Sequence, residues 1–253
     1  MRNIDECRFD RPLYTVAQVA RLVGMNSSVL ETWTRGDGQL AGPQLVGSAP
    51  LVTSVRPDAS HRSIPFIGLV EATVVQAFRR IQLPTARIRR ALQALAGGSA
   101  SLTLTGGSGS FERSASRVHP LASRQILVAG ADALRDYAVR SGDGQIRLLT
   151  VVSSGHTAFH DVIDDYLVRV LFEDDDPWAT SLIVPVTTKP VLRVSPGVAD
   201  GDPIFINGGA PLSAVRSRWR AGEPIASIAD DYGVPVDDMN EAIDALWPDH
   251  VAA

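Results

Sequence analysis

The stretch Thr15-Val-Ala-Gln-Val-Ala-Arg-Leu-Val-Gly24 decides the fold at the front of this chain. Its apolar residues recur with helical spacing after Thr15, whose hydroxyl can cap the helix. Gly24 can make the turn that follows, and Ser27 or Ser28 can cap a second short helix. Two short helices joined by a glycine turn are typical of a helix–turn–helix, so residues 13–35 predict one.

A second stretch near the other end has a similar pattern: Pro224-Ile-Ala-Ser-Ile-Ala-Asp-Asp-Tyr-Gly-Val-Pro235, with helical spacing that continues to Leu246. The charges around the two stretches differ in sign. Residues 1–95 carry a net charge of +5, and residues 96–253 carry a net charge of −9. Because a basic surface attracts phosphates and an acidic one repels them, the two patterns are expected to bind different ligands.

The composition is that of an ordinary soluble globular protein, with 45% hydrophobic and 21% charged residues in 253. One cysteine, Cys7, excludes an intramolecular disulfide framework and a cysteine-rich zinc site. The sequence contains neither a signal-peptide pattern nor an apolar run of membrane-spanning length. A cytoplasmic protein without a membrane partner is therefore expected.

Between the two patterns the sequence changes character several times. Residues 36–63 contain short β-like pieces, Gln44–Val46 and Leu51–Val55, that would form a two-stranded wing. An apolar repeat from Phe66 to Ile81 predicts a helix, Pro84 begins another that runs through Leu95, and residues 97–109 read as a linker.

The rest of the chain predicts a small mixed unit followed by helices. Helices are expected over Leu212–Ala221, about 224–232 and 236–246, and one near 157–165. The fold class is therefore α+β, with units at residues 1–96, 110–194 and 195–253: a winged helix–turn–helix, a mixed α+β unit, and three helices with a second helix–turn–helix. The strand-like runs of the middle unit are Gln125–Val128, Ile146–Val152, Tyr166–Phe172, Ser181–Val186 and Val191–Val194.

The front pattern is the candidate for DNA binding. Its second helix would enter the major groove with exposed side chains near base edges or phosphates, and the presumed wing would meet the backbone. An alternative is that the helix pair only packs against other elements and its arginines are solvated. The candidate DNA-binding residues are Asn26, Ser28, Thr32 and Arg35 on the helix, and Arg56 and Arg62 in the wing.

The rear pattern is a candidate for protein binding. Its would-be recognition helix carries four acidic residues, which would repel a duplex. The preceding helix carries three arginines, of which Arg216 and Arg220 share a face at i,i+4 spacing. The candidate protein-binding residues are Arg216, Arg218, Trp219 and Arg220, and the acidic residues are Asp237, Asp238, Glu241 and Asp244.

No catalytic constellation and no complete metal site stand out. His156 and His160 have i,i+4 spacing beside Asp161 and Asp164, but two histidines without a cysteine make an incomplete zinc set. The glycine-rich run Gly106–Ser110 lacks the ending of a phosphate-binding loop. The sequence therefore predicts no metal, no cofactor and no enzyme.

Six segments carry a resemblance to a known family: Ser195–Gly209, Trp219–Glu223, Ile228–Val234, Phe66–Glu71, Ile88–Leu92 and His119–Ser123. They resemble VapB-type antitoxins of the longer kind, whose front half is similar to MerR-type DNA-binding domains. The resemblance implies a type II antitoxin that binds a PIN-domain ribonuclease toxin and represses its own operon by binding operator DNA. The chain departs from the family's usual Gly-Thr-Arg or Gly-Thr-Gly at Gly208-Gly209-Ala210.

Two other readings stay open. A ligand-sensing MerR-like regulator without a toxin partner would use residues 118–194 as its sensor, and an adaptor would use the front helices only for packing. A homodimer is expected, because helix–turn–helix readers gain affinity from two half-sites. The apolar repeat from Phe66 to Ile81, followed by Ile88, Leu92 and Leu95, could supply its helix pair.

Overall fold

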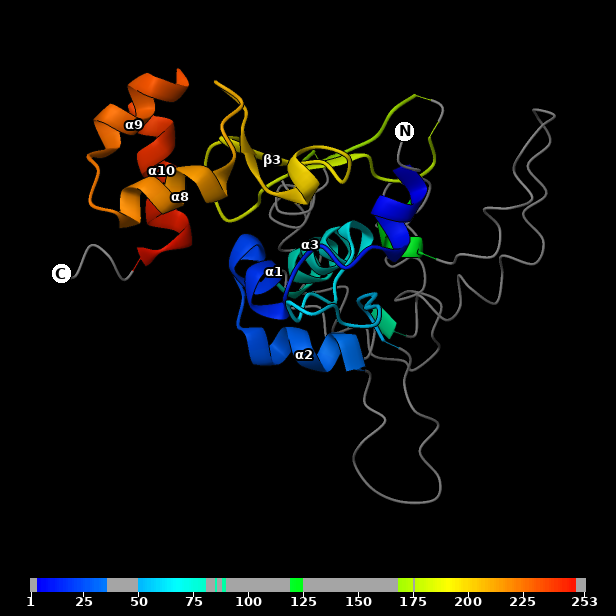
Figure 1. Cartoon of the computed structure of the whole chain (residues 1–253). Coiled ribbons are helices and arrows are strands. Elements are labelled where there is room, and N and C mark those ends of the chain that lie inside the picture. The colour runs from blue at the N-terminus through cyan, green and yellow to red at the C-terminus, as the bar shows by residue number, and fades with distance from the viewer. Residues whose placement is uncertain are drawn as a thin grey trace, which may run out of the picture.

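The computed structural model describes residues 4–35, 50–80, 85, 88–89, 119–124, 168–174 and 176–248 (Figure 1). The predicted strand Gln44–Val46, the linker at 97–109, the strands Gln125–Val128 and Ile146–Val152, the helix near 157–165 and the pair His156 and His160 lie outside these residues. Of the helix expected from Pro84, residues 85, 88 and 89 are described, and they are helical.

The front helix–turn–helix has the predicted form. Helix α1 (Val16–Val23) begins at a capping box, in which the Thr15 side chain accepts a hydrogen bond from the backbone of Gln18 and Gln18 bonds back to Thr15. Gly24 ends α1 in the left-handed conformation. Helix α2 (Ser27–Arg35) follows, and Asn26, not Ser27 or Ser28, provides its cap by accepting the backbone N–H of Ser28 at 2.9 Å.

The second wing strand expected at Leu51–Val55 is absent. Residues 50–65 instead form an irregular segment with one turn, in which Val55 N–H donates to Ser63 O at 2.8 Å. The segment is extended but does not form the hydrogen-bond ladder of a β-sheet. Leu51 and Val52 are buried under α2, and their N–H groups donate to the carbonyl of Trp33 instead of to a neighbouring strand. We refer to residues 55–63 as the wing turn.

Helix α3 (Phe66–Arg80) is the central helix of the front unit. Its residues from Phe66 through Val75 are all buried, and Figure 1 shows it between α1 and the sheet. An apolar helix covered on all sides belongs to the core of its own chain. The part of the predicted dimer interface from Phe66 to Phe78 therefore lies in the core of the chain, whereas Ile81, Leu92 and Leu95 of the same prediction lie outside the described residues.

Four short antiparallel strands lie beside α3 in the order β1-β2-β3-β4. They are β1 (Val170–Leu171), β2 (Ser181–Ile183), β3 (Leu192–Val194) and β4 (Ile204–Phe205). The first three fall inside predicted strand-like runs. The sheet joins residues on both sides of position 195, because β3 pairs with β4 through Leu192 and Phe205.

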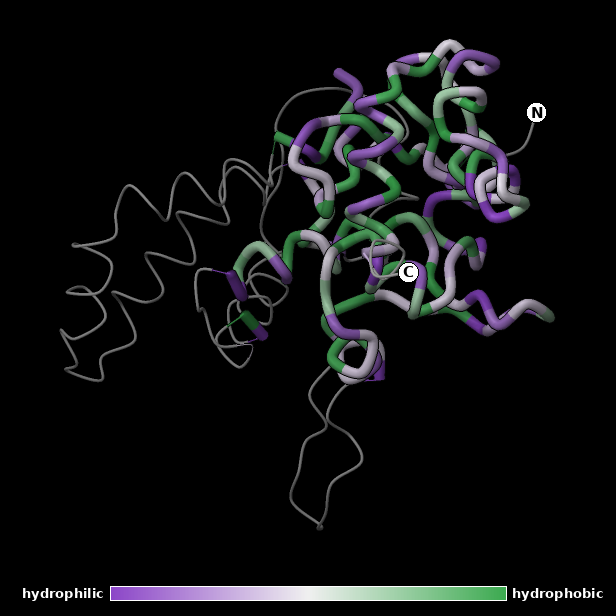
Figure 2. The backbone as a smooth tube through the Cα atoms, turned by 90° about the vertical axis from the view of Figure 1, so that its left-hand side faces the viewer, coloured by the Kyte–Doolittle hydropathy of each residue, from purple (hydrophilic) through white to green (hydrophobic). Residues whose placement is uncertain are grey.

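Three helices complete the chain where the sequence predicts them: α8 (Leu212–Arg220), α9 (Ile225–Tyr232) and α10 (Val236–Leu246). Gly233 turns the chain between α9 and α10 with φ of 62°. Ile228, Met239 and Ile243 are fully buried among these helices. In Figure 2 hydrophobic and hydrophilic residues alternate along the tube, so each helix presents one apolar side.

Polar contacts join the N-terminal segment to residues in the second half of the chain. Arg8 lies in a short π-helix, η1 (Glu6–Asp10), and is 1% exposed. Its guanidinium donates to both carboxylate oxygens of Asp176 at 3.0 and 2.7 Å. The Tyr14 hydroxyl donates to the carbonyl of Gly201 at 2.7 Å, in the short 3-10 helix η5 (Ala199–Gly201). These long-range contacts hold η1 and Tyr14 against the loop between β1 and β2 and against η5.

A buried polar cluster fixes a further segment. Glu71 on α3 lies 3.0 Å from Nδ1 of His119 and accepts the backbone N–H of Thr53 at 2.6 Å. His119 precedes the 3-10 helix η4 (Pro120–Ala122) and stacks on Phe9 with a centroid separation of 5.2 Å. The segment around His119 is thereby held against α3.

Candidate nucleic-acid and protein interfaces

Helix α2 presents one face to solvent and the other to the core. Leu30 and Trp33 are buried, whereas the exposed side carries Ser27, Ser28, Glu31, Thr32 and Arg35. This is the orientation that a recognition helix needs, since base edges are reached only by outward side chains. The candidate DNA-binding residues of this helix therefore share one accessible surface.

Local hydrogen bonds preorganise several of these side chains. Oδ1 of Asn26 accepts from the Ser28 hydroxyl at 2.7 Å, and Oγ1 of Thr32 donates to the carbonyl of Val29 at 2.7 Å. Arg35 is 70% exposed and lies 3.6 Å from Glu31, a long ion pair at i,i+4 spacing. An exposed pair of this kind contributes little and can exchange Glu31 for a phosphate.

Asp58 organises the wing turn. Its side chain accepts the backbone N–H groups of Ser60 and Arg62, each at 2.9 Å, and Nε of Arg62 at 2.7 Å. Burial opposes ionisation, but the hydrogen bonds from Arg62 and Ser60 outweigh it, so the pKa of Asp58 is lowered. Arg56 is exposed on the same turn. The wing turn thus presents one exposed arginine and a second held by Asp58.

The arginines of α8 separate into two groups. Arg218 donates to Glu223 and to Asp231, the latter at 2.5 Å, and lies over the Tyr232 ring at 5.4 Å. The bonds to Glu223 and Asp231 raise the pKa of Arg218. Arg218 therefore ties α8 to the turn before α9 and to α9 itself.

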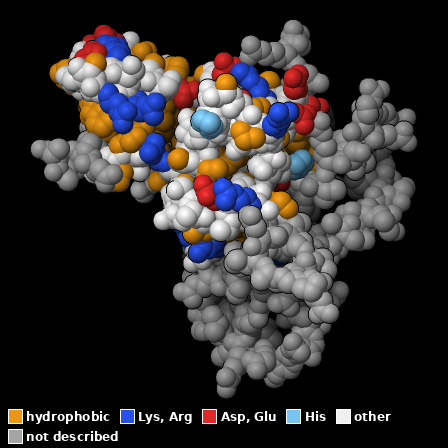
Figure 3. All heavy atoms as spheres, turned by 60° about the horizontal axis from the view of Figure 1, so that its bottom comes forward, with side chains coloured by type: hydrophobic (Ala, Val, Ile, Leu, Met, Phe, Trp, Pro, Cys, Tyr) orange, Lys and Arg blue, Asp and Glu red, His pale blue; other side chains and the backbone are white. Residues whose placement is uncertain are grey.

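Arg216 and Arg220 lie on another side of α8, as their i,i+4 spacing predicts. Arg216 lies 5.8 Å from the centroid of the Trp247 ring, and the rings of Trp219 and Trp247 are 6.0 Å apart. Arg220 is exposed. Figure 3 shows basic side chains beside hydrophobic ones on the C-terminal helices, a combination frequent in protein-binding surfaces.

The acidic helix α10 is partly turned toward its own chain. Glu241 accepts the backbone N–H of Thr188 at 2.6 Å, and Asp238 accepts Nδ2 of Asn207 at 2.8 Å. Asp237 and Asp244 are exposed. The second helix–turn–helix therefore offers a duplex neither a basic surface nor an unobstructed recognition helix.

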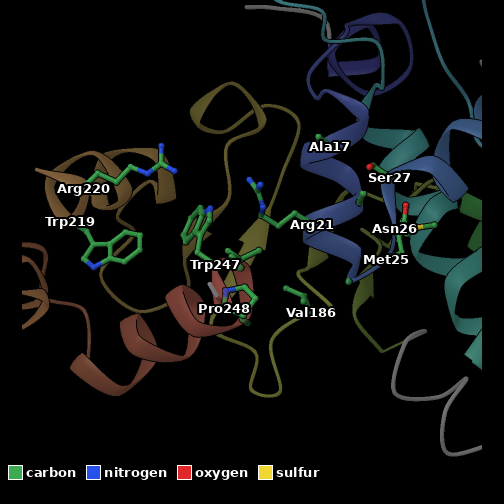
Figure 4. A pocket seen from close by; sticks show the side chains of 14 residues that line it. Ala17, Arg21, Met25, Asn26, Ser27, Val186, Trp219, Arg220, Trp247 and Pro248 are labelled. Atoms are coloured by element: carbon green, nitrogen blue, oxygen red, sulfur yellow. The ribbon is translucent and has the colours of Figure 1, made fainter. Parts of the chain in front are cut away.

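A groove separates the front and rear helices, and the sequence did not predict it. It has a volume of about 1060 Å³ and is open to solvent. Residues 17–27 form one wall, and the ends of α8 and α10 form the other (Figure 4). Arg21 and Trp247, which line it, come from opposite ends of the sequence, so no local pattern could have brought them together.

The described residues contain no cluster of three or more metal-ligating side chains and no helix long and apolar enough to cross a membrane. The predicted sites consequently reduce to two surfaces, the exposed face of α2 with the wing turn and the face of α8 that carries Arg216 and Arg220.

Comparisons with known proteins bear on the front unit and on the chain as a whole. Residues 12–92 match a family described as a putative DNA-binding helix–turn–helix domain. The chain is 33% identical over 248 residues to a protein named "Putative antitoxin VapB45" from Mycobacterium tuberculosis, covering 95% of this chain and 96% of that one. The crystal structure of Rv2018 from the same organism superimposes with a TM-score of 0.68 at 32% identity, covering 94% of this chain and all of that one. The chain therefore belongs to the family of the VapB45 antitoxin and carries a helix–turn–helix domain in its front third.

Proposed function

We propose that this protein is an antitoxin that binds its operator through the front unit and neutralises a PIN-domain ribonuclease through the C-terminal unit. The observation that carries the proposal is the exposed face of α2, in a chain similar to VapB45 over almost its whole length. The units are taken as residues 1–96, 110–194 and 195–253.

In the DNA complex, Asn26, Ser28 and Thr32 reach base edges from the start of α2, where the helix enters the major groove. Arg35 lies at the far end of α2 and meets a phosphate, as do Arg56 and Arg62 of the wing turn. All of these residues except Arg62 are exposed, and the net charge over residues 1–95 is +5, which supports these roles. Arg62 is half-buried and paired with Asp58, so it would have to exchange that carboxylate for a phosphate.

The DNA-binding roles are tested by fluorescence anisotropy with the protein's own promoter DNA. We expect Arg35→Ala and Arg62→Ala each to weaken binding to all sequences alike and to reduce the slope of log K against log salt by about 1. Arg193→Ala is the control, because Arg193 is exposed on β3 away from both surfaces. A change in sequence preference without a change in affinity would contradict the phosphate roles.

In the toxin complex, Arg216, Trp219 and Arg220 contact the ribonuclease. Clustered carboxylates hold the metal ion of a PIN domain, and an arginine that pairs with them can displace the metal and stop cleavage. Arg218, also predicted as a contact, is held by Glu223 and Asp231 and supports the surface from behind.

The toxin-binding role predicts that a PIN-type ribonuclease is encoded beside this gene, and that ribonuclease is used for the test. The full chain is expected to co-purify with that ribonuclease and to stop its RNA cleavage in vitro. An Arg216→Ala, Arg220→Ala double variant is expected to restore cleavage. If the intact protein neither captures nor inhibits the ribonuclease, the antitoxin assignment is wrong.

A homodimer is proposed from the way helix–turn–helix proteins match two half-sites about one helical turn apart. Because α3 is buried, its interface must use another surface. Light scattering that gives a 27.0 kDa monomer both free and DNA-bound would exclude the dimer.

A further inference from the structure

The groove between the two helix–turn–helix units is built from both ends of the chain. Residues 17–27, around the α1–α2 turn, face the ends of α8 and α10, and Val186 lies in the groove between them. In Figure 4 the Arg21 side chain reaches from α1 toward Trp247. Its volume of about 1060 Å³ is at the upper end of the range for small-molecule pockets, about 300–1,000 Å³, and it is open to solvent. A polypeptide segment fits such a groove better than an enclosed metabolite does.

The charge of the groove selects an acidic ligand. Arg21 from α1 and Arg220 from α8 line it from its two walls, and both are exposed. No acidic residue is among the described residues that line it. The groove lining therefore carries two guanidinium groups and no carboxylate. Arg21 and Trp247 also line an adjoining pocket, where Arg62 and Arg216 accompany Asp200 and Asp202, so arginines outnumber carboxylates across the two pockets and the potential inside the groove is positive.

The remaining lining selects apolar and aromatic contacts. The Trp219 and Trp247 rings lie at the rear wall, and Met25, Val186 and Leu246 contribute apolar surface. Tryptophan and arginine are the residue types that most often dominate protein–protein binding energy. A duplex backbone could neutralise the two arginines, but its phosphates and sugars would leave the indole faces and the apolar lining uncovered. The lining therefore favours protein over DNA.

We propose that this groove receives an acidic segment of the toxin that also carries aliphatic or aromatic side chains. Toxin binding then uses the front unit as well as the C-terminal unit, with Arg21 as a contact that the sequence did not suggest. This proposal rests on the proposed function for the identity of the partner, but its residues come from the groove alone.

Charge reversal in the full chain tests the groove. Arg21→Glu and Arg220→Glu alter exposed side chains, so both variants are expected to fold, which their thermal melting checks. Each is expected to weaken capture of the neighbouring PIN-type ribonuclease at least about tenfold, a loss of about 1.4 kcal/mol. Arg193→Glu is the control with the same change of charge outside the groove, and its affinity is expected to stay within about twofold of the parent.

A second probe does not depend on the toxin. A synthetic twelve-residue peptide of alternating glutamate and leucine is expected to change the tryptophan fluorescence of the parent, because two of the four tryptophans, Trp219 and Trp247, line the groove. Of the other two, Trp33 is buried, and Trp178 packs against Phe9 and His119 outside the groove. A lysine–leucine peptide is expected to have no effect, and neither peptide is expected to act on Arg21→Glu. This arm separates failure of the groove from failure of the antitoxin assignment.

Three results would overturn the proposal. The first is parent-like toxin capture by both charge-reversal variants. The second is loss of operator binding with toxin capture intact, which would assign the groove to a phosphate backbone. The third is loss of a dimer in the variants, which would assign the groove to a second copy. If the parent captures no toxin but binds the acidic peptide through Arg21, the proposed function fails while the groove's ligand class stands.

Discussion

Replacing Gly68 by alanine tests how the segment around Thr53 is held over α3. Gly68 lies in the first turn of α3, and a Cβ added there would meet Thr53 O at 2.4 Å and Cγ2 of Ile64 at 2.8 Å. Ordinary carbon–oxygen contacts are about 3.3–3.6 Å, so the Thr53 backbone would have to move by about 1 Å. That movement would pull the N–H of Thr53 away from Glu71, to which it now donates at 2.6 Å.

The magnitudes decide the sign of the effect. Alanine favours a helix over glycine by about 1 kcal/mol, which alone would stabilise the variant. Against this, a lost buried hydrogen bond costs about 1 kcal/mol. Overpacking against Ile64 and the Thr53 backbone costs a further 1–3 kcal/mol or so. We expect the free energy of unfolding to fall by about 1–3 kcal/mol, with Tm lower by roughly 2–12 °C for a chain of this size.

Urea unfolding followed by circular dichroism measures this change. The matched control is Gly197→Ala, where the new Cβ would meet only Cδ1 of Ile4, at an ordinary 3.8 Å. The control is expected to stay within about 0.5 kcal/mol of the parent. A Gly68→Ala variant as stable as the parent would refute the argument, because it would mean that the Thr53 segment does not rest on α3.

Three further predictions concern single side chains. Tyr14→Phe removes a buried hydrogen bond and is expected to lower the free energy of unfolding by about 1–2 kcal/mol. Because burial raises the pKa of Tyr14, the parent should also lose stability as pH rises above 10.0, by up to about 1.4 kcal/mol per pH unit. Unfolding measured at pH 8 and pH 11 should show a smaller loss of stability at the higher pH in the variant than in the parent. Asp58→Asn keeps a side-chain acceptor for the backbone of the wing turn but removes the negative charge that faces Arg62. Promoter binding should therefore tighten, and the slope of log K against log salt should grow by about 1. The control Asp237→Asn on α10 should leave the affinity and the slope unchanged. Arg218→Ala leaves Glu223 and Asp231 without the cation that they share, so it should lower Tm. A variant with the same Tm as the parent that no longer captures the toxin would show that Arg218 contacts the toxin directly.

The local parts of the fold were predictable from sequence because their causes are local. Thr15 as a cap, Gly24 as a left-handed turn and the three rear helices each follow from residue types within a few positions. The error at Leu51–Val55 has a tertiary cause. These residues have strand-like composition, but their N–H groups bond to α2 and to Glu71 instead of a neighbouring strand.

The predicted use of the α3 repeat as a dimer surface failed for a related reason, because α3 is buried in its own chain. The apolar repeat of α3 signals burial, and periodicity alone does not distinguish a partner's surface from the chain's own core. Glu71 is buried on the same helix and bonds to His119 and Thr53. In the sequence, Glu71 appears only as a charged residue that interrupts the apolar face, and its two partners cannot be inferred. The groove was out of reach altogether, because the Arg8–Asp176 and Tyr14–Gly201 contacts that orient its two walls join residues 168 or more positions apart.

The structure also explains why two similar motifs in one chain serve different partners under the proposed function. In the front motif the second helix keeps its outer face open, and the nearby carboxylates of Glu31 and Asp58 are each paired with an arginine. In the rear motif Glu241 is bonded to the turn between β2 and β3, so docking α10 into a major groove would first break contacts within the chain and then bring acidic side chains against phosphates. What remains accessible there is the end of α8, where arginine and tryptophan face the α1–α2 turn across the groove. The front motif therefore presents its second helix, α2, whereas the accessible surface beside the rear motif is the end of α8, the helix that precedes α9. The two surfaces meet at the start of α2.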